Sequence, residues 1–89
     1  MGITFNEEAS RFELEKDGLI AVAEFELEPG LMSVTHVVVP RPLQGSGVGS
    51  ALAAEVIAHA RRENIRVEPV CQFMQTYFVR HPETHDVLA

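Results

Sequence analysis

The sequence predicts a single α/β domain in which a mixed antiparallel and parallel sheet packs against two helices. Three observations lead to this fold class. The first half of the chain alternates apolar and polar residues between strong turn signals, which is typical of antiparallel strands. A four-turn amphipathic stretch follows it, and a short strand and a second helix come after that stretch. The 89 residues leave room for one compact domain, residues 1–89, with the order β-β-β-α-β-α.

The first half of the chain predicts an antiparallel meander of three strands. Residues 10–16 alternate apolar and polar side chains, and the Asp-Gly pair at 17–18 favours a hairpin. Residues 19–27 alternate in the same way, and a Glu-Pro-Gly turn leads into a third strand over residues 31–39. That strand ends in three consecutive valines, which indicates a central strand buried on both faces.

The second half predicts a crossover helix, one more strand and a second helix. Pro-Arg-Pro at 40–42 ends the third strand, because proline has no N–H to donate. Residues 47–62 place an apolar side chain at every fourth position, which gives a helix one apolar stripe. Residues 65–70 predict a fourth strand, residues 72–80 a second helix, and residues 83–89 a tail. Because one helix connects the third and fourth strands, we expect them to be parallel neighbours.

Composition excludes several classes of function. The net charge of −6 speaks against nucleic acid or an anionic membrane as a partner and is compatible with an amine substrate. The chain lacks the apolar segment of a signal peptide or a membrane span, so we expect a cytoplasmic domain. Cys71 is the single cysteine, which excludes paired-cysteine metal sites. His81 and His85 flank Pro82, which disrupts the helical spacing of a metal pair, so we predict no metal.

The most informative segment is residues 44–49, Gln-Gly-Ser-Gly-Val-Gly, between a buried strand and a helix start. Its glycines let the backbone turn sharply and approach a ligand, and the first helical N–H groups attract an anion such as phosphate. A Walker loop is excluded because no lysine follows the glycines. Glu68 stands where a dinucleotide fold places its ribose-binding acid. However, Ser50 replaces the last glycine of that fingerprint, and the chain is too short for a doubly wound sheet.

The spacing of Gln44, Gly47 and Gly49 resembles the Q/R-x-x-G-x-G/A motif with which GCN5-related N-acetyltransferases (GNAT) bind acetyl-coenzyme A. Nearly the whole chain resembles the short, single-domain members of that family, sometimes called YjdJ-type. The further matching stretches are Arg-Phe-Glu-Leu at 11–14, Asp17-Gly18, His36, Val39-Pro40, Ala60-Arg61, Pro69-x-Cys71-x-Phe73, Tyr77 and Arg-His-Pro-Glu at 80–83.

The resemblance implies a GNAT-like domain whose third and fourth strands splay apart and admit acetyl-coenzyme A as a co-substrate. It implies that the pantetheine arm pairs along Val38 and Val39. Arg41 is a further candidate for a phosphate contact, and the alternative is a solvated surface arginine. The activity implied is acetyl transfer to an unidentified small amine, or to a peptide or protein amine. The residues implied to hold the pyrophosphate are Gln44, Gly45, Ser46, Gly47, Val48 and Gly49.

One departure from the subfamily bears on proton transfer. Related short chains usually read H-T-E-V-P where this chain has His36-Val37-Val38-Val39-Pro40, so the threonine and the glutamate are missing. A carboxylate on this strand serves as general base in many GNAT enzymes, and valine moves no proton. The departure shifts the chemistry onto other groups. It also supports an alternative function, a non-catalytic coenzyme-A-binding or protein-interaction module.

Three residues are candidates for catalysis. Cys71 ends the fourth predicted strand and His36 lies on the third, so the fold brings both toward the splayed opening. A histidine beside a thiol can activate it as a nucleophile, so Cys71 could accept the acetyl group, or His36 could deprotonate the amine directly. Tyr77 stands where the family often places the acid that protonates the departing thiolate. For each residue there is a structural alternative: Cys71 could be a buried, inert cysteine, His36 a core histidine bonded to backbone, and Tyr77 a packing aromatic.

Overall fold

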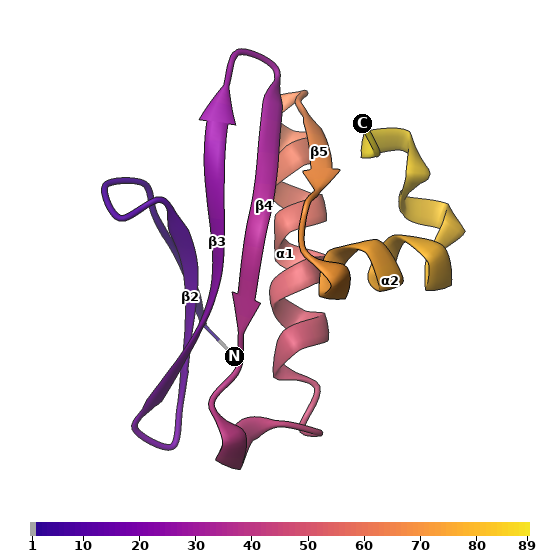
Figure 1. Ribbon diagram of the computed structural model, residues 1–89. Helices are drawn as coiled ribbons and strands as arrows, with labels where there is room; N and C mark the ends of the chain where they lie inside the picture. Colours follow the sequence, from indigo (N-terminus) through magenta and orange to yellow (C-terminus); the bar gives the residue numbers. More distant parts are fainter. Residues whose placement is uncertain (1) are drawn as a thin grey trace.

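Five strands form one mixed sheet in the computed structural model, which describes residues 2–89 (Figure 1). The sheet order is β1-β2-β3-β4-β5, with antiparallel neighbours from β1 to β4 and a parallel pair β4–β5. The elements are β1 (Ile3–Asn6), β2 (Arg11–Lys16), β3 (Leu19–Glu28), β4 (Leu31–Val38), η1 (Arg41–Leu43), α1 (Val48–Glu63), β5 (Arg66–Pro69), α2 (Gln72–Arg80) and η2 (Pro82–Val87).

The predicted α/β class and the parallel pair across the crossover helix are confirmed. The structure adds three elements that sequence patterning missed, namely β1 and the 3-10 helices η1 and η2. Strand β1 pairs with β2 and places Phe5 opposite Phe12, but its four residues are too few to show alternation. Most of the segment expected to be a tail forms the 3-10 helix η2, in which the side chains of Thr84 and Val87 are buried.

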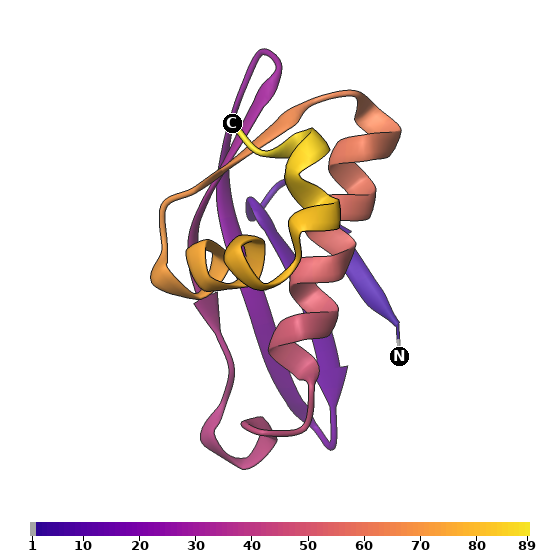
Figure 2. The same cartoon turned by 90° about the vertical axis from the view of Figure 1, so that its right-hand side faces the viewer.

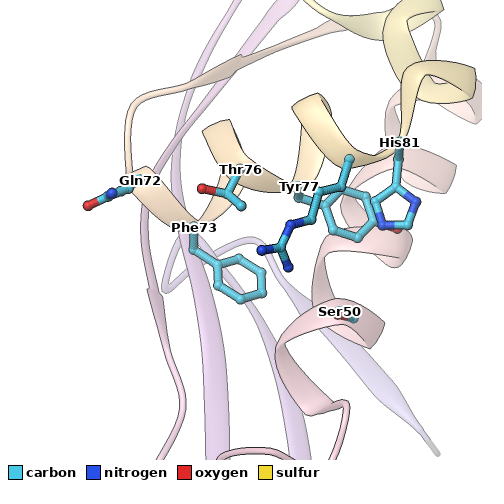
Figure 3. A pocket seen from close by; sticks show the side chains of 7 residues that line it. Ser50, Gln72, Phe73, Thr76, Tyr77 and His81 are labelled. Atoms are coloured by element: carbon cyan, nitrogen blue, oxygen red, sulfur yellow. The ribbon is translucent and has the colours of Figure 1, made fainter.

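One face of the sheet forms the core with both α-helices. The buried face alternates as predicted along β2 and β3, and Met74 and Phe78 of α2 join the same cluster. Figure 2 shows α2 beside α1 with η2 in front of α1, and Figure 3 shows Phe73 of α2 directed toward the α1 segment that carries Ser50. Leu27 departs from the alternation and is 44% exposed, because the β3–β4 hairpin extends past the helices (Figure 1).

The prediction that the third predicted strand is central is confirmed, but the prediction that its end is buried on both faces is wrong. Val38 is 51% exposed, whereas Val37 and Val39 pack against the core. The helices of the described chain contribute to the core on one face only, and β5 ends before it reaches this level. At the end of β4, consecutive valines therefore do not indicate burial on both faces, because only alternate side chains pack against the core.

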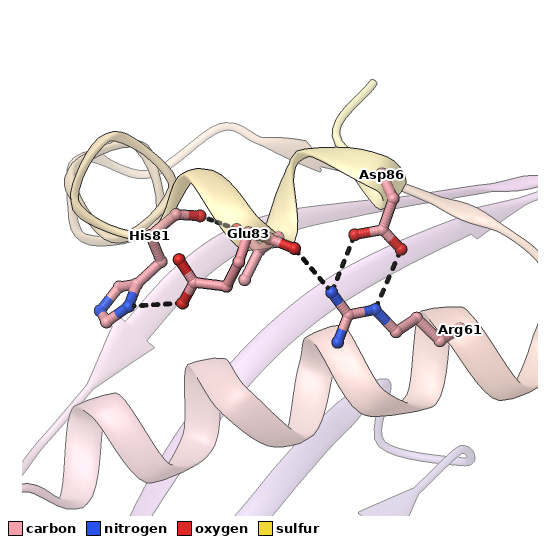
Figure 4. A network of polar contacts seen from close by, with 5 residues as sticks. Arg61, His81, Glu83 and Asp86 are labelled. Atoms are coloured by element: carbon pink, nitrogen blue, oxygen red, sulfur yellow. Dashed lines mark hydrogen bonds and ion pairs between the residues drawn. The ribbon is translucent and has the colours of Figure 1, made fainter.

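The C-terminal segment is fixed to α1 by one arginine (Figure 4). The Arg61 guanidinium donates to both carboxylate oxygens of Asp86, at 3.0 and 2.8 Å, and to the backbone oxygen of Glu83 at 2.9 Å. The hydrogen bonds from Arg61 lower the pKa of Asp86 below its ordinary value. At the chain end, the Ala89 N–H donates to the Val67 carbonyl of β5 at 2.9 Å.

We predict that Arg61→Ala loosens the C-terminal segment without unfolding the domain, because it removes three hydrogen bonds between α1 and η2. Hydrogen exchange at the Leu88 and Ala89 amides should become several-fold faster, while β2 and β3 keep their protection. Arg62→Ala is the matched control, since Arg62 pairs with Glu55 within α1. Equal exchange at the chain end in the two variants would contradict this role of Arg61.

Candidate functional site

The parallel strands β4 and β5 separate halfway along β4. Their last pair is Val34 with Pro69, and beyond it the Val34 carbonyl accepts both the Val70 N–H, at 3.1 Å, and the Cys71 N–H, at 3.2 Å. Strand β5 then leads into α2, whereas β4 continues to Val38 (Figure 1). Within residues 2–89, the β4 edge from 35 to 38 has no strand partner on this side. Such an edge can pair with the amide groups of an extended ligand.

A β-bulge in β4 lies where the strands separate. Phe25 pairs with Val34 and Glu24 pairs with His36, so Thr35 is an extra residue in the ladder. The bulge shifts the alternation of β4 by one residue. Val34 before it and Val37 after it both contact the core, while the His36 side chain is 68% exposed on the opposite face of the sheet.

The glycine loop holds an unusual backbone that its sequence permits. Gly45 and Gly47 have φ of +82° and +84°, the left-handed region in which glycine carries no Cβ penalty. The Gln44 side-chain amide donates to the Val39 carbonyl at 3.1 Å, and the Ser46 hydroxyl donates to the Leu43 carbonyl. These two hydrogen bonds hold the loop in place, one of them to the residue that follows β4.

The start of α1 leaves its N–H groups available. The first helical hydrogen bond runs from the Ala51 N–H to the Gly47 carbonyl, at 3.0 Å. The N–H groups of Val48, Gly49 and Ser50 therefore have no partner inside the helix. The helix has no side-chain cap and no acidic residue in its first turn. The positive end of the helix dipole consequently faces the loop without a compensating charge, which suits an anion.

A cavity of about 440 Å³ joins the β4 edge to the glycine loop. Val37 and Val39 form one wall, and Phe73 of α2 forms part of another. Phe73 packs directly over the helix start, since a Cβ on Gly49 would lie 2.8 Å from the Phe73 ring. Glycine at position 49 therefore permits this close packing of α2 on α1. The loop residues that line the cavity are Leu43, Gln44, Gly45, Gly47, Val48, Gly49 and Ser50.

A second cavity, of about 460 Å³, adjoins the first and shares Ser50 and Phe73 with it. Tyr77 lines this second cavity, and its ring stacks on His81 with centroids 4.1 Å apart (Figure 3). Burial, and secondarily the negative charge of Glu83, raise the pKa of Tyr77 above its ordinary value. Tyr77 is thus a phenol that stays protonated through neutral pH, in a cavity that adjoins the loop cavity at Ser50 and Phe73.

The structure places the candidate catalytic residues in different surroundings. The His36 imidazole is not a core group bonded to backbone: its Nδ1 lies 3.2 Å from the Thr35 hydroxyl and 3.5 Å from a Glu24 carboxylate oxygen. Cys71 is half-buried at the N-cap of α2 and packs against the core. In the described chain no hydrogen bond joins Cys71 to His36.

Two other predictions concern charge and metals. Arg41 is exposed in η1, directly before the glycine loop, and it forms no ion pair within residues 2–89. Within the same residues, no group of three or more metal-ligating side chains comes together.

Sequence reasoning missed Glu24 and Phe73 as parts of the site. Glu24 adjoins His36 only through the strand register, which the bulge alters. The contact of Phe73 with Gly49 depends on where α2 packs on α1. The sequence signal for Phe73 was its place two residues after Cys71 in the Pro69-x-Cys71-x-Phe73 match.

Comparisons with known proteins agree with this geometry. The family model described as GCN5-related N-acetyl-transferase matches residues 11–87. The NMR solution structure of a GCN5-like protein from Staphylococcus aureus superposes with a TM-score of 0.79 at 24% identity, covering 99% of this chain and 87% of that one. A comparison with curated proteins finds no significant match. Among the described residues, no helix is long and apolar enough to cross a membrane.

We predict that Tyr77 ionises at a higher pH in the folded protein than in the denatured chain, where about 10 is expected. It is the only tyrosine and the chain has no tryptophan, so near-ultraviolet absorbance reports on this phenol alone. Because ionisation opposes the folded state, stability should fall as pH rises past about 10. Glu83→Gln should lower the midpoint only in part, since burial is the larger cause. Coincident native and denatured titrations would disprove the shift.

Proposed function

The chain belongs to the family of GCN5-related N-acetyltransferases, and on this premise we propose that it transfers an acetyl group from acetyl-coenzyme A to an amine. The observation that carries the proposal is the cavity joining the open β4 edge to the uncapped start of α1. One end of this cavity suits an extended chain with amide groups, and the other end suits an anion. A pantetheine arm that ends in a pyrophosphate has both properties in this order.

We assign the two ends of the ligand to backbone groups. The pantetheine amides pair along Val38 and Val39 as an added strand, between the apolar side chains of Val37 and Phe73. The pyrophosphate accepts hydrogen bonds from the N–H groups at the start of α1. Each such charge-assisted bond contributes roughly 1.5–3 kcal/mol, so three supply much of the approximately 8 kcal/mol of a micromolar affinity. Arg41 adds a positive charge beside the loop.

The chemistry needs one base and one acid. In the proposed direct route, the amine nitrogen attacks the thioester carbonyl carbon, and the new C–N bond forms as the amine gives a proton to the His36 imidazole. The C–S bond then breaks, and the coenzyme thiolate takes a proton from Tyr77. Solvent afterwards removes the proton from His36 and returns one to Tyr77. The raised pKa of Tyr77 suits this role, because it keeps the phenol protonated.

A covalent route through Cys71 is the alternative mechanism. There the acetyl carbon would bond first to the Cys71 sulfur as the bond to the coenzyme sulfur breaks, and the amine would then attack the acetyl-cysteine. The direct route is favoured because His36 is held by Thr35 and Glu24 and is not hydrogen-bonded to the thiol. A coenzyme-A-binding module without catalysis is the second candidate function, and the two valines at 37 and 38 favour it.

The acceptor is an amine, and we propose that it is either a small molecule or an amine of a peptide or protein. The net charge of −6 attracts a cationic amine and disfavours nucleic acid and anionic membrane surfaces. The exposed setting of His36 allows a bulky acceptor to approach from the open face of the sheet.

We predict that Gly47→Asp weakens coenzyme A binding at least about tenfold, or about 1.4 kcal/mol, because it places a carboxylate against the anion site. Gly47 and Gly30 both have positive φ and open space at the Cβ position, so aspartate at either costs about 1–2 kcal/mol of stability. Gly30→Asp, in the β3–β4 turn, is therefore the matched control. Calorimetry that finds equal affinities in the two folded variants would refute the loop assignment.

We predict that His36→Ala lowers turnover by about 10²-fold or more with coenzyme A affinity unchanged, whereas Cys71→Ala keeps most of its turnover. Thiol release with a panel of amines measures turnover, and mass spectrometry tests for acetyl on Cys71. Acetylated Cys71 together with an inactive Cys71→Ala variant would establish the covalent route. Tight coenzyme A binding with no thiol release from any amine would favour the binding module.

A further inference from the structure

Glu24, Thr35 and His36 form a cross-strand cluster on the open face of the sheet. Strand pairing sets Glu24 of β3 opposite His36 of β4, and Thr35 is the bulged residue beside them. Neighbouring residues of a regular strand point to opposite faces. The bulge instead brings the Thr35 hydroxyl to within 3.2 Å of Nδ1 of the adjacent His36.

Counting protons in this cluster favours one neutral form of the imidazole. The Thr35 hydroxyl has one proton, which it donates to the Glu24 backbone carbonyl at 3.3 Å. Toward His36 the hydroxyl can then only accept a hydrogen bond. The Glu24 carboxylate oxygen 3.5 Å from Nδ1 can likewise only accept. Both neighbours of Nδ1 therefore favour a proton on that nitrogen, and in that neutral form Nε2 keeps its lone pair.

We propose that Glu24 and Thr35 are positioning residues that hold His36 in the Nδ1–H tautomer, so that Nε2 is the atom that takes the proton of the acceptor amine. The catalytic part of this inference rests on the proposed function. The Glu24 carboxylate lies on the Nδ1 side of the ring, which is where a carboxylate lies behind a catalytic histidine in other enzymes. The neighbouring strand β3 thus supplies the carboxylate that β4 lacks, because valine occupies positions 37 and 38.

The tautomer can be measured without any assay of activity. Long-range ¹H–¹⁵N spectra of the ¹⁵N-labelled protein distinguish protonated from unprotonated ring nitrogens. They would be recorded about two pH units above the ordinary histidine pKa of about 6.5, where rings are neutral. The chain has four histidines, and His36→Ala identifies the signals of His36 by their loss. The expected result for the wild type is a proton on Nδ1 of His36.

Matched substitutions test what fixes the tautomer. Glu24→Ala and Thr35→Val should each move the proton partly to Nε2, and the double variant should do so further. Thr35→Ser keeps the hydroxyl and should keep the Nδ1–H form. Glu26→Ala removes the same charge from the same face of β3, two residues away, and should change nothing. Backbone ¹H–¹⁵N spectra of the same samples report whether each variant is folded.

Turnover provides the second measurement. Glu24→Ala and Thr35→Val should lower turnover about tenfold with unchanged coenzyme A affinity, while Thr35→Ser and Glu26→Ala retain it. A wild-type His36 protonated at Nε2, or a tautomer unchanged in the double variant, overturns the inference even if acetyl transfer is observed. A tautomer that responds as expected in a protein that releases no thiol from any amine supports the positioning and overturns its catalytic use.

Discussion

The site depends on a mismatch in strand length: β5 pairs with β4 for four residues, and β4 then continues for four more beside β3 with no strand on its other edge. Two N–H groups converge on the Val34 carbonyl, which ends the parallel ladder and turns the chain into α2. The unpaired edge of β4, the position of α2 over the start of α1, and the cavity between them all follow from this separation. An unpaired strand edge presents N–H and C=O groups to its surroundings, and these are the groups with which the proposed extended ligand would pair.

The second local constraint is the bulge at Thr35, which changes what each face of β4 presents. Before the bulge, Met32 and Val34 enter the core, and after it Val37 and Val39 do so. The same shift puts His36 on the open face, beside Glu24 of the next strand. One extra residue therefore provides both an apolar wall for the coenzyme arm and a histidine with polar partners, on opposite sides of one strand.

The sequence predicted the parts of this fold that depend on local backbone chemistry. The glycine loop, the start of α1 and the limits of α2 follow from positive φ, capping and apolar periodicity, all of which are properties of consecutive residues. Three features could not be predicted in this way: the exposure of Val38, the pairing of Glu24 with His36, and the contact of Phe73 with Gly49. They depend on strand register and on the crossing of two helices, which no short window of sequence encodes. Strand β1 escaped prediction because four residues give too little pattern.

The open face of the sheet has a consequence for selectivity. The helices in the described part of the chain pack on the other face, and the His36 imidazole is 68% exposed. On this face the site has no wall, so it cannot discriminate among acceptors by shape there, and water can reach the thioester from this side. For the proposed transfer, discrimination among amines would then come from how strongly each competes with water as a nucleophile. Because the same opening that admits acceptors of any size also admits water, the bound thioester would be slowly hydrolysed.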